Sequence, residues 1–206
     1  MNFTLTDEEG ALLVRLARAA ITEYLLNKRR LKPPGDVPNK LKTECGVFVT
    51  LNKITDEGME LRGCIGYPEA ILPLAEATID SAFNAAFRDP RFHPLTVEEL
   101  DRILVEVSVL TPLQLIEAKN PKDYPRQVRI GEDGLVVERG GFRGLLLPQV
   151  PVEWRWDEEE FLSNCCMKAG LTPDSWLLNG TKVYKFQAII FMEETPKGAV
   201  KRVSLR

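Results

Sequence analysis

The order of apolar and polar positions predicts that the chain opens with a helix over residues 6–30. Thr6 and Glu9 have the spacing of a capping box, and apolar residues then recur every three or four positions. The helix should end before Pro33, because consecutive prolines remove backbone donors and fix φ. The segment KPPGDVPNK is therefore expected to be an exposed loop.

A first block of strands and helices follows this loop. Its expected elements are strands over 46–51 and 59–65 around a turn at 55–58, a helix over 71–86, a short helix opened by the capping box at Thr96, and a strand over 103–110. The longer helix should end at Asp89, because Pro90 bars its continuation.

A second block repeats the same order. Its expected elements are strands over 134–139 and 142–147 around Gly140-Gly141, a helix capped by Asp157, a short helix at Thr172-Pro173, and a closing strand over 183–192. Near-equal spacing between corresponding elements predicts two related repeat units, at about 41–112 and 127–193.

This order predicts an α+β fold, because hairpins pair antiparallel and the helices do not follow every strand. Each repeat alone has too few strands to cover its own apolar face. We therefore expect two intertwined strand-strand-helix-helix-strand repeats with a mainly antiparallel sheet and one shared core. They would form a single domain over residues 1–206, with two lobes as the alternative division.

Composition narrows the class of protein. With 206 residues, 44% of them apolar and 28% charged, the chain is an ordinary globular one. No apolar stretch approaches the roughly 18 residues of a membrane span, and the start MNFTLTDEEG lacks the features of a signal peptide. We expect a cytoplasmic protein that does not enter a membrane.

Charge and metal-ligating residues exclude further classes. The net charge is −3 and the pI about 5.4, which disfavours nucleic acid as a partner. The exception is the basic tail with Lys197, Lys201, Arg202 and Arg206, which is either a solvated end or a docking patch. Four cysteines without C-x-x-C spacing and a single histidine predict no metal site, and the sequence identifies no cofactor.

The segment LRGCIGYPE, residues 61–69, carries the first candidate site. In a regular strand Arg62 and Cys64 face the same way, so the guanidinium would lower the pKa of the thiol. Gly63 and Gly66 would let a ligand or another backbone approach closely. The alternative is that Cys64 is a small packed side chain. A reversible bridge from Cys64 to Cys45 across the hairpin is a further hypothesis, against simple packing.

The segment DPRFHP, residues 89–94, carries the second candidate site. Its prolines would hold Asp89, Arg91 and His93 in place at low entropic cost, although the same pattern also stops and turns a helix. His93 beside Cys64 would form a thiol-imidazole pair. Trp154 and Trp156, near a strand end, would either wall a pocket or close the core.

Several of these segments together resemble the AMMECR domain family, named for a human chromosomal region linked to Alport syndrome and elliptocytosis. They are GVFVTL, LRGCIG, AFRDPRFHPLT, GLLLPQV and FLSNCCMKAGL. The resemblance implies an α+β fold of two intertwined repeats in an intracellular protein. It also implies Memo-like or radical-SAM proteins as partners, since the domain is sometimes encoded beside them or fused to them. It brings no established reaction.

Three functions stay open at this point. The first is an enzyme or an accessory domain that uses Cys64 as nucleophile or redox thiol, with Arg62 binding or activating and Asp89, Arg91 and His93 orienting. The second is a scaffold that binds a protein or a small molecule through the same surface. The third is RNA binding through basic loops such as Lys28-Arg29-Arg30, which the acidic balance disfavours.

Overall fold

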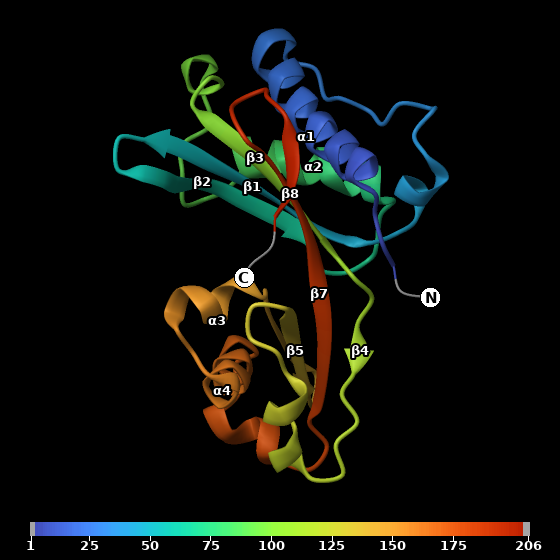
Figure 1. Ribbon diagram of the computed structural model, residues 1–206, viewed down its shortest axis with the longest axis vertical. Helices are drawn as coiled ribbons and strands as arrows, with labels where there is room; N and C mark the ends of the chain where they lie inside the picture. Colours follow the sequence, from blue (N-terminus) through green and yellow to red (C-terminus); the bar gives the residue numbers. More distant parts are fainter. Residues whose placement is uncertain (1–2, 204–206) are drawn as a thin grey trace. The chain divides into compact units, whose positions relative to one another are not determined.

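A computed structural model describes residues 3–203, which fall into two compact units (Figure 1). Unit 1 comprises residues up to Leu110 together with a return segment from Ile189, and unit 2 comprises Thr111–Ala188. Arg206 of the basic tail lies outside the described residues. Among the described residues, no helix has the length and apolar character needed to cross a bilayer.

Unit 1 contains two long helices and the strands of the first hairpin. Its elements are α1 (Asp7–Asn27), η1 (Asn39–Lys42), β1 (Gly46–Thr55), β2 (Gly58–Tyr67), α2 (Leu74–Phe87), η2 (Val97–Glu99), β3 (Ile103–Leu110), the last part of β7 (Lys182–Glu193) and β8 (Val200–Val203). Helices α1 and α2 lie together against one face of these strands (Figure 1).

The capping boxes form as expected. Thr6 Oγ1 accepts a hydrogen bond from the N–H of Glu9 at 3.2 Å, and the Glu9 carboxylate accepts one from the N–H of Thr6 at 2.8 Å. Helix α1 ends at Asn27, three residues before the expected limit, because Lys28 adopts a left-handed conformation with φ 57°. Helix α2 begins after Pro73 and ends at Phe87.

The sheet of unit 1 has the strand order β2-β1-β3-β7, with β2 as a terminal strand and β8 also paired to β7. Pairing is antiparallel, and it contains one irregularity. Leu51 pairs with Gly63 while Asn52 pairs with Leu61, so Arg62 is an extra residue in a β-bulge. A bulge breaks the strict alternation of side chains between the two faces of a strand.

Unit 2 contains the second hairpin and its helices. Its elements are β4 (Gln114–Leu115), η3 (Pro121–Asp123), η4 (Pro125–Gln127), β5 (Asp133–Arg139), β6 (Phe142–Leu146), α3 (Gln149–Trp154), α4 (Glu158–Lys168), η5 (Pro173–Leu177) and the first part of β7. β7 pairs antiparallel with β5 and with β4, and Asp157 caps α4 as expected.

The α+β class and the mainly antiparallel sheet are confirmed. The expectation of one shared core is not met, because the buried apolar residues form two clusters. In unit 1, α1 and α2 cover the sheet face that carries Val49, Leu51 and Val107. In unit 2, α4 contributes Phe161 and Leu162 to the second cluster. The helices of each block therefore supply the cover that the strands alone lack.

The division into two compact units does not test the repeats expected at about 41–112 and 127–193. The closing strand β7 begins in unit 2 and ends in unit 1, where Phe191 is fully buried in the first cluster. The first block has the expected element order, and the second has it with one additional short helix, α3, between β6 and α4. The relation between them as sequence repeats stays a prediction.

Two local expectations are corrected. The basic tail is not a free solvated end within the described residues, because Val200–Val203 forms β8 and Arg202 pairs with Asp7 at 2.9 Å. Trp156 packs against the unit 2 cluster. Trp154 stacks on the Trp156 ring with 6.2 Å between the ring centroids, and it stays 68% exposed. Only Trp156 therefore closes the core.

Candidate functional site

The loop that follows α2 is fastened to the edge strand β2 by Asp89. Its buried carboxylate accepts a hydrogen bond from the backbone N–H of Cys64 at 2.9 Å, and it binds Arg91 through the Nε at 3.0 Å and the Nη2 at 2.7 Å. The hydrogen bonds from the Arg91 side chain are the main cause that lowers the pKa of Asp89 to about 2, and the Cys64 N–H adds to the effect against the opposing effect of burial.

Arg91 completes this attachment on the other side of the same peptide. Its Nη2 donates to the backbone oxygen of Cys64 at 3.3 Å. One side-chain acceptor and one side-chain donor thus satisfy the outward backbone groups of Cys64, as a neighbouring strand would. Asp89 and Arg91 come together as expected, but they hold the strand backbone rather than the thiol.

Arg62 points away from this attachment because it is the bulge residue. It forms a two-bonded ion pair with Glu99, from Nε to Oε1 at 2.8 Å and from Nη2 to Oε2 at 3.0 Å. The Nη2 also donates to the backbone oxygen of His93 at 2.9 Å. The Arg62 hydrogen bonds are the main cause that lowers the pKa of Glu99 to about 2, and Lys53 at 3.4 Å contributes.

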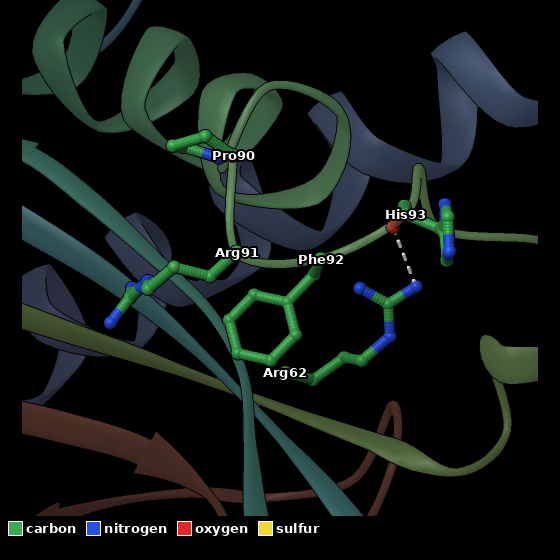
Figure 2. Close-up of a pocket in the computed structure, with 5 residues that line it drawn as sticks. All are labelled: Arg62, Pro90, Arg91, Phe92 and His93. Atoms are coloured by element: carbon green, nitrogen blue, oxygen red, sulfur yellow. Dashed lines mark hydrogen bonds between the residues drawn. The ribbon is translucent and has the colours of Figure 1, made fainter.

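A pocket of ≈ 350 Å³ opens beside this ion pair. It is lined by Arg62, Pro90, Arg91, Phe92 and His93, and Figure 2 shows the two arginines on opposite sides of the Phe92 ring. The guanidinium carbons lie 5.8 Å (Arg62) and 5.4 Å (Arg91) from the ring centroid. The ring therefore separates the two cations and interacts with both.

The Nη1 of Arg62 is buried and has no hydrogen-bond partner in the described part of the chain. The other two nitrogens of the same guanidinium are occupied by Glu99 and His93. A buried donor without a partner is unfavourable, since it has lost its water without gaining a hydrogen bond. Among the described side chains that line the pocket, Arg62 is the one with a buried nitrogen or oxygen that lacks a hydrogen-bond partner.

The Cys64 thiol lies in a different environment from the one expected. It accepts a hydrogen bond from Thr50 Oγ1 at 3.3 Å, and Thr50 is its partner on β1. Burial is the main cause that raises the pKa of the thiol, and the effects of Thr50 and Arg91 in the opposite direction do not overcome it. The expected activation of the thiol by Arg62 is therefore wrong. The bulge directs Arg62 to Glu99, and the guanidinium that lowers the pKa of the Cys64 thiol is that of Arg91.

Two further expectations about cysteines are corrected. Among residues 3–203, no hydrogen bond links the His93 ring to the Cys64 thiol, and His93 instead supplies a backbone oxygen to Arg62. Cys45 does not face Cys64 across the hairpin, because the strand register sets Thr50 opposite Cys64. Cys45 and Cys64 are both free thiols.

Gly63 and Gly66 are explained by packing. A side chain on Gly63 would overlap the backbone oxygen of Ala85 in α2, and one on Gly66 would overlap the backbone of β1 at Val47. The absence of a side chain at Gly63 lets α2 lie directly on the strand. Gly144 in unit 2 has the same relation to the backbone of α4, at Ala169.

Sequence reasoning missed Glu99 and Phe92 as members of the site. Glu99 belongs to the capping box at Thr96, where its carboxylate accepts a hydrogen bond from the Thr96 N–H at 3.1 Å. Its second role, as the partner of Arg62, joins residues 37 positions apart and has no local signal. Within the described residues, no three His, Cys, Asp or Glu side chains gather as a metal ion would require.

Comparisons with known proteins identify the relatives of the chain. The AMMECR1 family model matches residues 14–191. A Pyrococcus horikoshii protein, PH0010, is 56% identical over 206 residues, which is 100% of both chains. The Methanocaldococcus jannaschii protein MJ0810 is 52% identical over 196 residues, 95% of this chain and 96% of that one.

A solved structure extends this likeness to the fold. The crystal structure of uncharacterized protein PH0010 from Pyrococcus horikoshii superposes with a TM-score of 0.88 at 56% identity, covering 98% of this chain and 100% of the other.

Proposed function

The chain belongs to the AMMECR1 family, and we propose that it acts as a binding module whose pocket beside Arg62 receives an anionic oxygen group of a ligand, a carboxylate or a phosphate. The observation that carries this proposal is that Arg62 lines the pocket while its buried Nη1 has no hydrogen-bond partner among the described residues. An anionic oxygen would satisfy that donor through a charge-assisted hydrogen bond.

The charges around the pocket support an anionic ligand. Two of the five residues that line the pocket are arginines, and none is acidic. Arg62 pairs with Glu99 and Arg91 with Asp89, but neither carboxylate is among the lining residues. A guanidinium that is already oriented by Glu99 and His93 binds an anion at a low entropic cost, because its side chain does not need to be ordered first.

The binding function is favoured over the thiol-based enzyme by the partners of Cys64. Burial raises the pKa of its thiol, so little thiolate is present at neutral pH. Its hydrogen-bond partner is Thr50, and Arg62 is engaged with Glu99. The interpretation of Cys64 as a packed side chain therefore fits these contacts better. Memo-like or radical-SAM partners stay a prediction from the resemblance.

An NMR titration tests the proposal. Sodium acetate and sodium phosphate are each added to isotopically labelled protein at constant ionic strength, and acetamide serves as the neutral counterpart of acetate. We expect acetate or phosphate to shift the Arg62 Nε–H signal and the amides of residues 91–93, while acetamide leaves them in place. Equal responses to acetate and acetamide would contradict an anion site.

A pair of variants locates the response. Arg62→Lys keeps the charge that pairs with Glu99 but removes the planar fork and its unpartnered nitrogen, so the shift on adding the anion should be lost or strongly reduced. Arg126→Lys is the matched control, because the Arg126 side chain is 85% exposed in unit 2. An unchanged response in Arg62→Lys would exclude Arg62 as the binding group.

A further inference from the structure

The first half of β2 is an unprotected strand edge. β2 is the terminal strand of its sheet, so one of its edges has no neighbouring strand in the described chain. The loop after α2 covers this edge only at Cys64, through Asp89 and Arg91. For residues 59–61, no side chain of the described residues forms a hydrogen bond to the backbone on this edge as Asp89 and Arg91 do at Cys64. An open edge of this kind pairs readily with an added strand.

The same half-strand exposes apolar side chains on one face. Met59 is 59% exposed and Leu61 45%, and they share a face because they are two positions apart. Ile54, the partner of Met59 on β1, is 40% exposed. Exposed apolar side chains beside an unpaired backbone edge are the features that a strand-adding ligand uses, with hydrogen bonds from the edge and side-chain contacts from the face.

The anion pocket lies at the end of this exposed edge, since Arg62, the residue after Leu61, lines it. Arg62 follows Leu61 directly, and its guanidinium turns to the pocket and Glu99 rather than to the thiol of Cys64. Successive side chains of an extended segment point to opposite faces. A segment laid along β2 would therefore present an acidic side chain toward Arg62 and apolar neighbours toward Leu61.

We propose that the ligand of this site is an extended polypeptide segment of a partner protein, which adds as a strand to the edge of β2 at residues 58–62 and places an acidic side chain in the Arg62 pocket, with apolar residues next to it. This inference rests on the proposed function, because the acidic side chain is the anion that the pocket receives. It adds the chemical class of the ligand and its mode of attachment.

Charge favours a foreign segment over a second copy of this chain. Two β2 strands paired antiparallel about their centre at Glu60 would bring two glutamates opposite each other. Directly opposed like charges destabilise a strand pair. An acidic side chain of a partner segment instead meets a pocket lined by Arg62 and Arg91 and by no carboxylate.

The test uses one blocked peptide, acetyl-Val-Thr-Val-Glu-Val-Thr-Val-amide, which is symmetric about its glutamate and so suits either strand direction. We expect NMR shifts at residues 58–62 together with those of the pocket. Replacing the glutamate of the peptide by glutamine should weaken binding about tenfold, the loss of roughly one charge-assisted hydrogen bond. Two N-methylated versions of the peptide, one methylated on its odd-numbered and the other on its even-numbered residues, should differ strongly in affinity. An added strand forms hydrogen bonds to β2 through alternate residues only, so only one of the two versions loses them.

Variants of the edge separate this inference from the proposed function. Leu61→Lys should weaken the peptide about tenfold while acetate still binds, because it alters the edge and its apolar face but leaves the pocket groups in place. Leu26→Lys is the matched control, since Leu26 is 59% exposed on α1. It should leave the affinity for the peptide and for acetate unchanged.

The outcomes discriminate. If acetate shifts the pocket and the peptide produces only those same shifts, or none, strand addition is excluded while the anion site stands. If neither acetate nor peptide binds, both proposals fail. Shifts at residues 58–62 that grow with protein concentration in the absence of peptide would identify a second copy as the occupant and overturn the inference.

Discussion

The carboxylate of Asp89 accepts a hydrogen bond from the backbone N–H of Cys64 at 2.9 Å. This bond joins the loop after α2 to the edge strand, and Arg91 binds both partners. The pocket residues Pro90 to His93 follow directly in the chain, so their position depends on this attachment. Asp89 is thus a structural residue whose loss should affect the stability of the fold and the pocket together.

Asp89→Asn should lower the free energy of unfolding by about 2 kcal/mol near neutral pH. The pKa of Asp89 is lowered to about 2 from 3.8, so the ionised carboxylate stabilises the folded state. This contribution is complete above the unfolded value and is lost as the pH falls from about 4 to about 2. Chemical unfolding of the wild type and the variant at a series of pH values measures the difference.

In that series, the two proteins should converge toward pH 2, and a constant difference down to that pH would show that the carboxylate charge is not the cause. Asp56→Asn is the control, since Asp56 is exposed in the turn between β1 and β2. It removes the same charge from the same hairpin without touching the loop after α2.

Gly63→Ala should destabilise the protein by about 1–3 kcal/mol or more, because its methyl group would overlap the backbone oxygen of Ala85 and force α2 away from β2. Gly35→Ala is the matched control. Nothing lies within 4 Å of the added methyl group there, so that change should be nearly neutral or slightly stabilising. Denaturant unfolding compares the two.

Gly144→Ala extends the same test to unit 2, where the methyl group would overlap the backbone of α4 at Ala169. We expect a loss similar to that of Gly63→Ala. Stability of Gly63→Ala equal to that of Gly35→Ala would show that α2 moves without cost, against the close contact seen here.

Cys64 should react slowly with iodoacetamide near neutral pH, because burial raises the pKa of its thiol and leaves little thiolate. It should still be the first of the four cysteines to react in the folded protein, since Cys45, Cys165 and Cys166 are buried. Mass spectrometry of the alkylated peptides over a pH series measures each rate. Unfolding in urea should accelerate all four.

An apparent pKa for Cys64 below that of an ordinary thiol, about 8.5, would revive the activated-thiol hypothesis. A separate check uses Cys64→Ala. This variant should keep its response to acetate or phosphate in the NMR titration, because the thiol does not line the pocket.

Arg18 and Glu193 form a buried ion pair inside unit 1, and Arg18 also donates to the backbone oxygens of Leu100 at 3.1 Å and Ile103 at 2.8 Å. Glu193 accepts in turn from the N–H of Val105 at 3.0 Å. Glu193→Gln leaves a buried guanidinium without its counter-charge, so we expect a loss of about 3–5 kcal/mol in unfolding free energy.

The control for this pair is Asp123→Asn, which breaks the exposed pair with Arg126 in unit 2. Exposed pairs contribute little, so its unfolding curve should overlay that of the wild type. A loss in Glu193→Gln no larger than in this control would show that water reaches the Arg18 pair.

Much of the fold was predictable because its signals are local. The capping boxes at Thr6, Thr96 and Asp157 form where the spacing indicates, and both hairpins have the expected turns. These features depend on hydrogen bonds between residues two to four positions apart. A short window of sequence contains all the groups involved.

The sequence singled out several residues that lie together in the structure, but not the contacts that they make. Arg62, Arg91 and His93 line one pocket, and Asp89 holds it in place. Regular alternation along the strand predicts Arg62 beside the Cys64 thiol. Arg62 is instead the extra residue of the bulge, and its side chain pairs with Glu99. A register shift of one residue moves a side chain to the other face of the strand. No residue near Arg62 in the sequence indicates that a bulge forms there.

The sequence by itself determined the order of the main helices and strands, the α+β class, and which residues carry the charges near β2, because those properties follow from neighbours along the chain. Only the tertiary structure decided that Cys64 faces Thr50, that Arg62 pairs with Glu99, and that the apolar residues divide into two cores. Strand register and long-range pairing select these contacts from many alternatives of similar local energy, so they exist only once the whole chain has folded.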